Sequence, residues 1–223
     1  MSDNWFYVHP PNVPLLKCEL GQDAIDYLWE RIKVAQVEDK NANNNLAGNI
    51  TQSLYLKDVD DYFFKNHLQE VSEKYAEEYS SVPSFRNPFT NVMVYKLKMR
   101  EFWVNFSKQH EFNPLHTHGG ALSFVVWLNI PTESEDQHNL PISKNSSAPV
   151  ASDFMFSFTN IFGQIAPFSI PMNSEVEGTM FLFPSVMTHQ VYPFYESDGI
   201  RVSISGNLYF DPEYIGPTDP GRS

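Results

Sequence analysis

Cysteine is almost absent from this chain of 223 residues, in which Cys18 is the only one. A single cysteine excludes an intrachain disulfide and favours a reducing compartment, so we expect a cytoplasmic protein. The chain also has no apolar run of membrane-spanning length, and its first residues, Met-Ser-Asp-Asn-Trp-Phe, lack the pattern of a signal peptide. We therefore expect no membrane partner.

Basic residues are scarce as well. The chain has 15 lysines and arginines against 27 aspartates and glutamates, which gives a formal net charge of -12. A phosphate backbone attracts the opposite balance of charge, so we expect no duplex nucleic acid among the partners. Hydrophobic residues, in contrast, make up 42% of the chain and aromatic residues 15%. These fractions and the length predict one globular domain over residues 1–223 with a sizeable core.

The first part of the chain, residues 1–85, is predicted to be an extension with two helices. Apolar side chains recur at helical spacing over residues 22–38 and again over residues 58–80. The second apolar stripe consists of Phe64, Leu68, Val71, Tyr75 and Tyr79. Short polar side chains predict a loop at residues 41–45, and prolines predict an irregular segment over residues 1–20 and a helix end at Pro83 and Pro88.

From Asn91 the apolar spacing changes to two, which is typical of strands. After this first strand region, further strands are predicted at residues 121–130, 153–158, 178–183 and 200–209. The polar segment 132–150 is predicted to be a long loop. Two helices followed by a run of strands indicate a β core over residues 90–210, with the helices packed on one side of a β-sandwich.

The most informative residues are histidines. His116 and His118 are separated by one residue at a predicted strand edge, so their side chains are expected to point the same way. A third, His189, comes much later in the chain, and Arg201 and Ser203 follow it on one face of another predicted strand. A near pair of ligands, a distant third ligand and a following Arg-x-Ser form the layout of an iron site that also holds a dicarboxylate co-substrate.

Four pieces of sequence, in this order, carry a resemblance to a known family. They are Asn113-Pro-Leu-His-Thr-His-Gly-Gly, Leu122-Ser-Phe-Val-Val-Trp-Leu-Asn-Ile-Pro, Leu182-Phe-Pro-Ser with His189, and Arg201-Val-Ser-Ile-Ser-Gly-Asn-Leu. Together they resemble the 2-oxoglutarate/Fe(II)-dependent dioxygenase superfamily, in particular the 2OG-Fe(II) oxygenases of phages and marine bacteria. The resemblance implies a mainly β fold, a double-stranded β-helix of the jelly-roll, cupin-like type, with the N-terminal helices packed on one sheet.

The resemblance also implies a chemistry. It implies an enzyme that uses Fe(II), 2-oxoglutarate and O2 and couples decarboxylation of the keto acid to oxidation of a C–H bond, as a hydroxylase does. His116, His118 and His189 would bind the metal, and Arg201 with Ser203 would hold the far carboxylate of 2-oxoglutarate. Asn105 is a weaker candidate for the other end of the co-substrate. The primary substrate is left open between a protein side chain and a small metabolite.

The chain departs from the common family pattern at His118. That position usually carries an aspartate or glutamate, so a neutral imidazole here leaves the site more positive. Three interpretations stay open: a working centre of three histidines, a site completed by another carboxylate such as Asp153, or a His118 that does not bind the metal.

Other functions also stay open. One alternative is a cupin-like three-histidine dioxygenase that binds its substrate without 2-oxoglutarate. Another is a non-catalytic jelly-roll domain that serves in binding or structure. In either case Arg201 need not be a clamp, and it could be a surface residue paired with Asp198 or Glu196.

Overall fold

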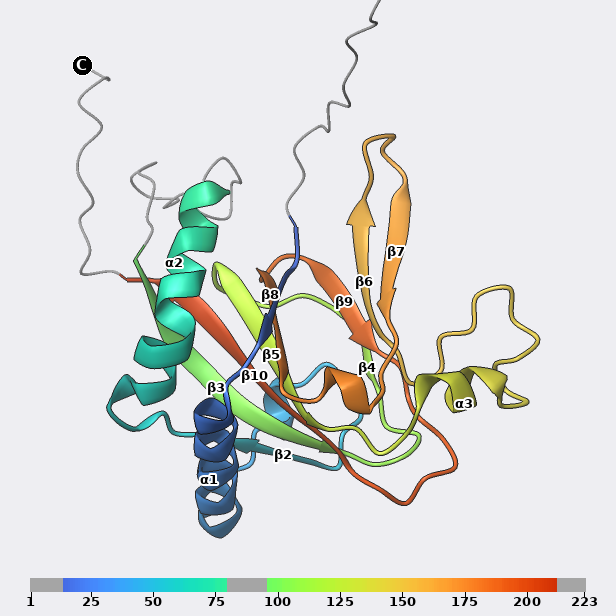
Figure 1. The fold of residues 1–223 in the computed structure, drawn as a ribbon, viewed down its shortest axis with the longest axis horizontal. Helices are drawn as coiled ribbons and strands as arrows, with labels where there is room; N and C mark the ends of the chain where they lie inside the picture. Colours follow the sequence, from blue (N-terminus) through green and yellow to red (C-terminus); the bar gives the residue numbers. More distant parts are fainter. Residues whose placement is uncertain (1–13, 80–95, 212–223) are drawn as a thin grey trace, which may run out of the picture.

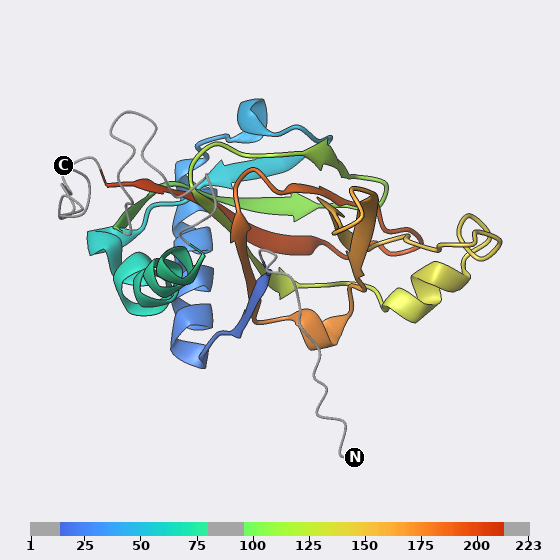
Figure 2. The ribbon, with the colours of Figure 1, turned by 90° about the horizontal axis from the view of Figure 1, so that it is seen from above.

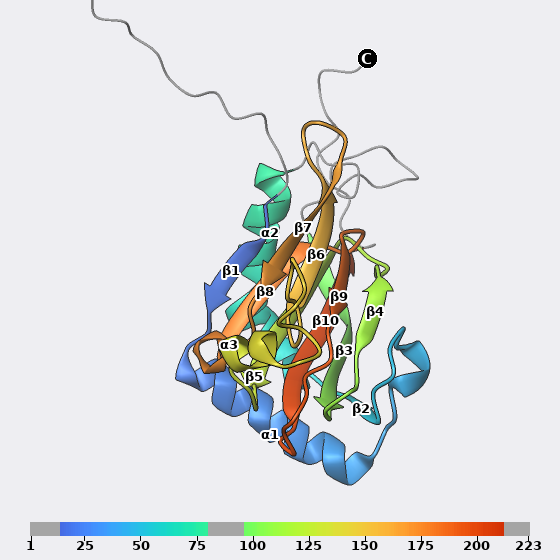
Figure 3. The ribbon, with the colours of Figure 1, turned by 90° about the vertical axis from the view of Figure 1, so that its right-hand side faces the viewer.

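The computed structural model describes residues 14–79 and 96–211, which form two antiparallel sheets that face each other (Figures 1 and 2). The larger sheet contains, in spatial order, β1 (Leu16–Glu19), β8 (Thr179–Pro184), β5 (Leu122–Asn129), β10 (Arg201–Phe210), β3 (Leu97–Ser107) and β2 (Gln52–Tyr55). The smaller sheet contains β4 (Asn113–His116), β9 (Thr188–Val191), β6 (Phe154–Thr159) and β7 (Ile165–Ile170). Figure 3 shows β10 between β5 and β3, in the middle of the larger sheet.

Helices cover the outer face of the larger sheet. They are α1 (Gln22–Glu38), the π-helical turn η3 (Phe64–Leu68) and α2 (Gln69–Glu78), and Figure 1 shows α1 and α2 on the side away from the smaller sheet. A short helix, α3 (Ser134–Asn139), lies at the opposite side of the molecule from α1 in Figure 2. The remaining turns are the 3-10 segments η1 (Asn43–Asn45), η2 (Val59–Asp61) and η5 (Ser174–Val176). The predicted arrangement, mainly β with the N-terminal helices packed on one sheet, is confirmed.

Strand alternation divides the interior into two cores. In β5, Leu122, Phe124 and Val126 pack into the core beneath the helices, whereas Val125 and Trp127 pack into the core between the sheets. The same sorting places the side chains of β8 and β10 on both faces of the larger sheet, because successive side chains point to opposite faces. A run of apolar residues in β5 therefore reflects a strand that is buried on both faces.

The predicted helix over residues 58–80 was wrong in its first part. The carboxylate of Asp58 accepts hydrogen bonds from the backbone N–H groups of Phe63 and Phe64, at 2.9 and 3.0 Å. Asp60 and Asp61 have positive φ angles of 56° and 57°, which a continuous helix does not permit. Helical backbone begins at Tyr62, passes through the π-helical turn η3 and continues as α2 to Glu78, and its predicted end at Pro83 and Pro88 lies outside the described residues.

Some short helices and strands were not predicted from the sequence. The segment 132–150, predicted as a loop, contains α3, where the buried Gln137 side chain bonds to the backbone of Tyr195 at 2.9 and 2.8 Å. The segment 1–20, predicted as irregular, contains β1, which pairs with β8 from Leu16 to Glu19. Such pairings are made with partners far away in the chain, so local pattern gives little sign of them. The predicted boundary between the two parts of the chain, at residues 85–90, lies outside the described residues.

Within the two described ranges, no helix has the length and apolar character that a membrane crossing requires.

Close approach of the backbone at Gly206 in β10 leads to a first prediction. A Cβ atom there would lie 2.6 Å from both the backbone oxygen of Glu101 and the ring of Phe124. We expect Gly206→Ala to lower the free energy of unfolding by about 2–3 kcal/mol, as overpacking of a rigid core does. Denaturant titration measures this change.

The matched control for this prediction is Gly21→Ala at the start of α1. Its added methyl group would meet the mobile carboxylate of Asp23, at 2.6 Å, so we expect a loss of about 1 kcal/mol or less. Equal losses for the two variants would contradict the packing argument.

Candidate metal centre and co-substrate pocket

Three histidines converge where β4 and β9 pair at the edge of the smaller sheet. β4 ends at His116, which lies opposite His189 in the ladder. His118 follows in the loop, where its backbone N–H donates to the carbonyl oxygen of Ser185 at 2.8 Å. The sequence predicted His118 at the strand edge, but His118 lies in the loop after β4. Its ring centroid is still only 4.8 Å from that of His116. One candidate ligand atom from each of the three rings lies within 4.8 Å of the others.

Backbone carbonyls orient two of these rings. Nδ1 of His116 lies 2.7 Å from the oxygen of Pro114, and Nδ1 of His189 lies 2.9 Å from the oxygen of Met187. A carbonyl oxygen only accepts hydrogen bonds, so each Nδ1 carries the proton and donates it. This leaves the lone pair of each Nε2 available to a metal, the arrangement that metal-binding histidines use.

Burial keeps the three imidazoles neutral. It lowers the pKa of His189 to about 3 and the pKa of His118 to about 4, with the nearby His116 adding to both effects. Burial also lowers the pKa of His116, against the raising effect of its hydrogen bond to Pro114. The rings of Phe154, Phe156 and Phe183 surround His189 and supply much of its apolar environment. Neutral imidazoles are the form that binds metals.

A small cavity, here called the inner cavity, lies between the sheets beside the histidines and has a volume of about 40 Å³. Besides the three histidines, its polar lining includes Trp103, Asn105, Asn113, Trp127, Ser203 and Ser205. The indole Nε1 atoms of Trp103 and Trp127 are buried and have no hydrogen-bonding partner. A buried donor without an acceptor is costly, so these atoms fit a cavity that takes up a ligand with acceptor oxygens.

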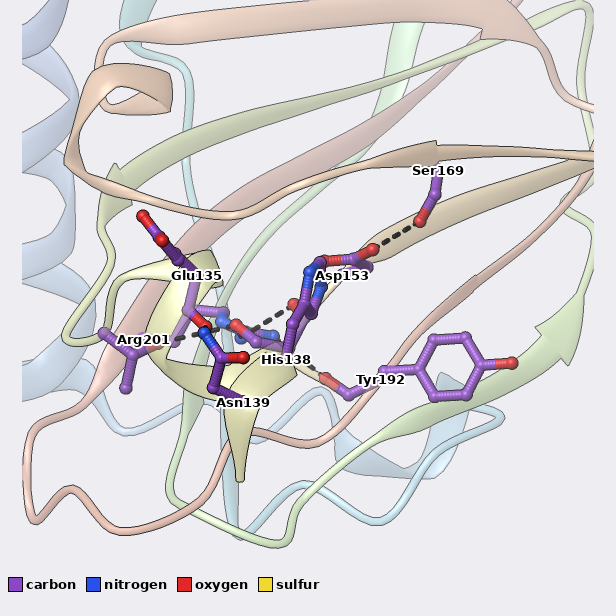
Figure 4. Close-up of polar contacts among 9 residues, drawn as sticks. Glu135, His138, Asn139, Asp153, Ser169, Tyr192 and Arg201 are labelled. Atoms are coloured by element: carbon purple, nitrogen blue, oxygen red, sulfur yellow. Dashed lines mark hydrogen bonds and ion pairs between the residues drawn. The ribbon is translucent and has the colours of Figure 1, made fainter. Parts of the chain in front are cut away.

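Arg201, the first residue of β10, is 2% exposed and does not line this cavity, but its guanidinium carbon lies 6.0 Å from the ring of Trp127, which does. Its Nη2 donates to the carbonyl oxygen and the hydroxyl of Ser152, at 3.0 and 2.6 Å, and its Nη1 donates to the carbonyl oxygen of Tyr192 at 3.2 Å (Figure 4). Its Nε is buried without a partner. Burial lowers the pKa of Arg201 to about 10, and the charge of Asp153 opposes this shift, so the guanidinium stays charged. Arg201 is therefore no surface residue paired with Asp198 or Glu196.

Asp153 lies outside the histidine cluster. Its Oδ1 lies 2.8 Å from Nε2 of His138, and its Oδ2 accepts a hydrogen bond of 2.6 Å from Ser169 (Figure 4). In the described part of the chain, the one cluster of candidate metal ligands contains histidines alone. Asp153 instead lies close enough to Arg201 for its charge to act on the guanidinium. The sequence offered no sign of its contact with His138, since 15 residues separate the two.

A second cavity, here called the outer cavity, has a volume of about 350 Å³ and shares His118 and Trp103 with the inner one. Its polar and aromatic lining includes Tyr55, Glu101, Asn207 and Tyr209. Glu101 accepts hydrogen bonds from the Asn207 amide and from the Tyr209 hydroxyl, the latter at 3.3 Å. No sequence pattern points to these residues, because Glu101 and Asn207 meet only through the pairing of β3 with β10.

Of the predicted co-substrate residues, Ser203 and Asn105 both line the inner cavity, and they are paired across β10 and β3. Oδ1 of Asn105 accepts a hydrogen bond of 2.8 Å from Ser53. Arg201 and Ser203 share the face of β10 that lies toward the smaller sheet, because Val202 and Ile204 between and beyond them belong to the helix-side core. The structure thus places Ser203 and Asn105 at the inner cavity with the three histidines, whereas Arg201 is not among the residues that line it, and the individual roles stay predictions.

Comparison with known proteins was made at three levels. Residues 101–207 match the family described as "Putative 2OG-Fe(II) oxygenase". This segment contains the three histidines and Arg201. No curated protein gives a significant match.

Solved structures show the same fold. The α-ketoglutarate-dependent carbocyclase SnoK from nogalamycin biosynthesis aligns with a TM-score of 0.53 at 9% identity, covering 88% of this chain and 79% of that one. The epimerase SnoN from the same biosynthesis aligns with a TM-score of 0.51 at 13% identity, covering 88% and 77%. A Pseudomonas putida prolyl-4-hydroxylase aligns with a TM-score of 0.48 at 13% identity, covering 88% and 92%. The first two alignments confirm the predicted jelly-roll fold.

The family match fixes the class of chemistry. Enzymes of this family use Fe(II), 2-oxoglutarate and O2, and the histidine cluster supplies a site with the donors that such a metal needs. Residues 101–207 match the 2OG-Fe(II) oxygenase family, and the chain is an Fe(II)- and 2-oxoglutarate-dependent oxygenase.

Proposed function

We propose that the enzyme is a hydroxylase in which His116, His118 and His189 bind Fe(II) and the inner cavity takes up 2-oxoglutarate. The observation that carries this proposal is the convergence of three neutral imidazoles beside a cavity lined with unpartnered N–H donors. When bound, Fe(II), 2-oxoglutarate and O2 supply the oxidation of a substrate C–H bond, coupled to the release of succinate and CO2. The residues of the chain bind, orient and shield these groups.

Arg201 and Ser203 are proposed to hold the far carboxylate of 2-oxoglutarate. Arg201 provides a buried positive charge and one unpartnered N–H, and Ser203 provides a hydroxyl on the same face of β10. Trp127 and Asn105 offer further donors along the inner cavity. At about 40 Å³ this cavity holds roughly three water molecules, so its side chains have to move apart to admit the keto acid.

The aromatic residues around His189 have a role of their own in this proposal. Phe154, Phe156 and Phe183 exclude water from the metal side of the inner cavity and keep the imidazoles unprotonated. Exclusion of water strengthens every electrostatic contact in the site and protects reactive species.

We further propose a single domain over residues 1–223 and a cytoplasmic location. Support for one domain comes from the core that α1 and α2 share with the larger sheet, and support for the location comes from the single cysteine, Cys18. The relationship to enzymes of phages and marine bacteria stays a prediction from the sequence.

The first test of the metal site replaces His116 or His189 with alanine. Either change should abolish Fe(II) binding at micromolar concentration, because two protein ligands are too few to hold the ion. Anaerobic Fe(II) titration followed by calorimetry measures this. The control His110→Ala removes an exposed histidine that packs on Tyr195, and it should bind Fe(II) like the parent. Fe(II) binding by both ligand variants at parental affinity would refute the site.

The second test concerns His118, where the chain departs from the common family pattern. His118→Asp should keep Fe(II) bound and retain at least uncoupled 2-oxoglutarate turnover, because a carboxylate is the usual ligand at this position. His118→Ala should weaken Fe(II) binding. Succinate release and Fe(II) titration report the two properties separately. Parental iron binding and turnover in His118→Ala would show that His118 does not bind the metal.

The third test removes the charge of the clamp. Losing a buried charge-assisted pair costs about 2–5 kcal/mol, so Arg201→Gln should weaken 2-oxoglutarate binding about 30-fold or more while Fe(II) binding is kept. Ser203→Ala should weaken 2-oxoglutarate binding about 10-fold, the value of one hydrogen bond to a charged group. The exposed Arg100→Ala is the control.

Calorimetry with 2-oxoglutarate and a thermal unfolding scan accompany each clamp variant, since Arg201 is also part of the packing around Ser152. A folded Arg201→Gln protein with unchanged 2-oxoglutarate affinity would remove Arg201 from the site. It would favour the alternative of a three-histidine dioxygenase that binds its substrate directly.

A further inference from the structure

We infer that the outer cavity binds a positively charged primary substrate, an ammonium or guanidinium group, with Glu101 as its counter-charge. This inference rests on the proposed function, because it places the substrate beside His118, which lines both cavities. At about 350 Å³ the outer cavity lies within the size range of small-molecule sites, which is about 300–1,000 Å³.

The hydrogen bonds of the Glu101 carboxylate leave one of its oxygens open to a cation. The amide of Asn207 and the hydroxyl of Tyr209 both donate to its Oε2, and in residues 14–79 and 96–211 its Oε1 has no hydrogen-bonding partner. No lysine or arginine of these ranges forms an ion pair with Glu101. A carboxylate that accepts hydrogen bonds on one oxygen and is open on the other favours a positively charged ligand with hydrogen-bond donors.

The carboxylate is also held firmly. Asn207 is 3% exposed, and its Oδ1 accepts a hydrogen bond of 2.7 Å from the buried Ser123. Ser123 in turn lies 2.9 Å from the hydroxyl of Ser185. Burial, followed by the charge of Glu101, raises the pKa of Tyr209, so its phenol keeps the proton that it donates to Glu101. This chain of contacts fixes the direction of the carboxylate before any ligand arrives.

Aromatic rings and a second open donor complete the site. Trp103, Tyr55 and Tyr209 line the outer cavity, and such rings attract a cation over their faces. Trp103 is 8% exposed and lines both cavities, so its unpartnered Nε1–H is open to an acceptor oxygen of a ligand in either one. A cation together with a nearby carbonyl or carboxylate oxygen is the chemistry of a basic amino acid, free or within a peptide.

The nearest described cation does not fill this place. The guanidinium carbon of Arg100 lies 5.4 Å from the centre of the Tyr209 ring, and Arg100 is an exposed residue. The register of β3 with β10 shifts at Arg100, and Met99 and Phe102 on either side face the helix-side core, so Arg100 and Glu101 lie on the same face of β3. There the guanidinium covers the Tyr209 ring, and Arg100 forms no ion pair with Glu101.

Charge also distinguishes the two cavities. Arg201 lies at the beginning of β10, and Asn207, which contacts Glu101, lies six residues further along the strand. At about 3.3 Å per residue, this separation is about 20 Å. The doubly negative 2-oxoglutarate is repelled at the Glu101 end and attracted at the Arg201 end, so each ligand is directed to its own cavity.

The test compares basic ligands with neutral analogues of the same shape. The probes are L-arginine with its neutral isostere L-citrulline, L-lysine with L-norleucine, and, for a residue within a peptide, N-acetyl-L-argininamide with N-acetyl-L-citrullinamide. Calorimetry under anaerobic conditions measures their binding to the full chain loaded with Fe(II) and 2-oxoglutarate. At least one basic probe should bind the parent 10-fold or more tightly than its neutral counterpart. Comparison of the probe pairs shows whether the site prefers a guanidinium or an ammonium group, and a free or a peptide-bound ligand.

Two variants test whether the preference for basic probes depends on the carboxylate of Glu101. Glu101→Gln keeps the acceptor for Asn207 and Tyr209 but removes the charge, so the preference for the basic probe should disappear. Glu19→Gln changes an exposed glutamate on β1 of the same sheet and should keep the full preference.

The outcomes separate this inference from the proposed function. Normal 2-oxoglutarate binding with no basic probe preferred over its neutral counterpart, or a preference that survives in Glu101→Gln, would overturn the inference alone. A parent that binds Fe(II) but no 2-oxoglutarate would overturn the proposed function and, with it, this inference.

Discussion

The alternation of side chains along β10 is the constraint on which both cores and both cavities depend. β10 pairs with β5 on one edge and β3 on the other, so its register is fixed on both sides. Val202 and Ile204 enter the core beneath the helices, whereas Ser203 and Ser205 line the inner cavity. A slip of one residue would turn Arg201 into the apolar core, and the cost of burying its charge there opposes such a slip.

The site combines neutral ligands with charges that lie further away. Three imidazoles bring no negative charge to a divalent metal, and Arg201 adds a buried positive charge in the same interior. Asp153 balances part of that charge, held in place by His138 and Ser169. If the three histidines bind the metal as proposed, the doubly negative co-substrate would supply the charge that a ligand carboxylate brings in the common family pattern. Binding of the metal and of the keto acid is therefore expected to be strongly coupled.

The rigid parts of the site are made by contacts of the backbone. Carbonyl oxygens fix the rings of His116 and His189, and Ser185 holds the backbone of His118. Ser152, with a positive φ of 73°, turns its carbonyl and hydroxyl toward Arg201. Pro114 belongs to β4, whereas Ser152, Ser185 and Met187 lie in loops that the paired strands hold in position.

Local sequence patterns were enough to predict the class of fold, the helix at residues 22–38, the main strands and the set of histidines, because periodicity and residue type are local properties. They also indicated Arg201 and Ser203, which lie on one face of a strand. The contacts that each side chain makes depend on the folded arrangement of the whole chain. The partners of Asp153, the open indoles of Trp103 and Trp127, and the placement of Glu101 against Asn207 follow from pairing between distant segments. Such pairing depends on the register of whole sheets, which no local pattern encodes.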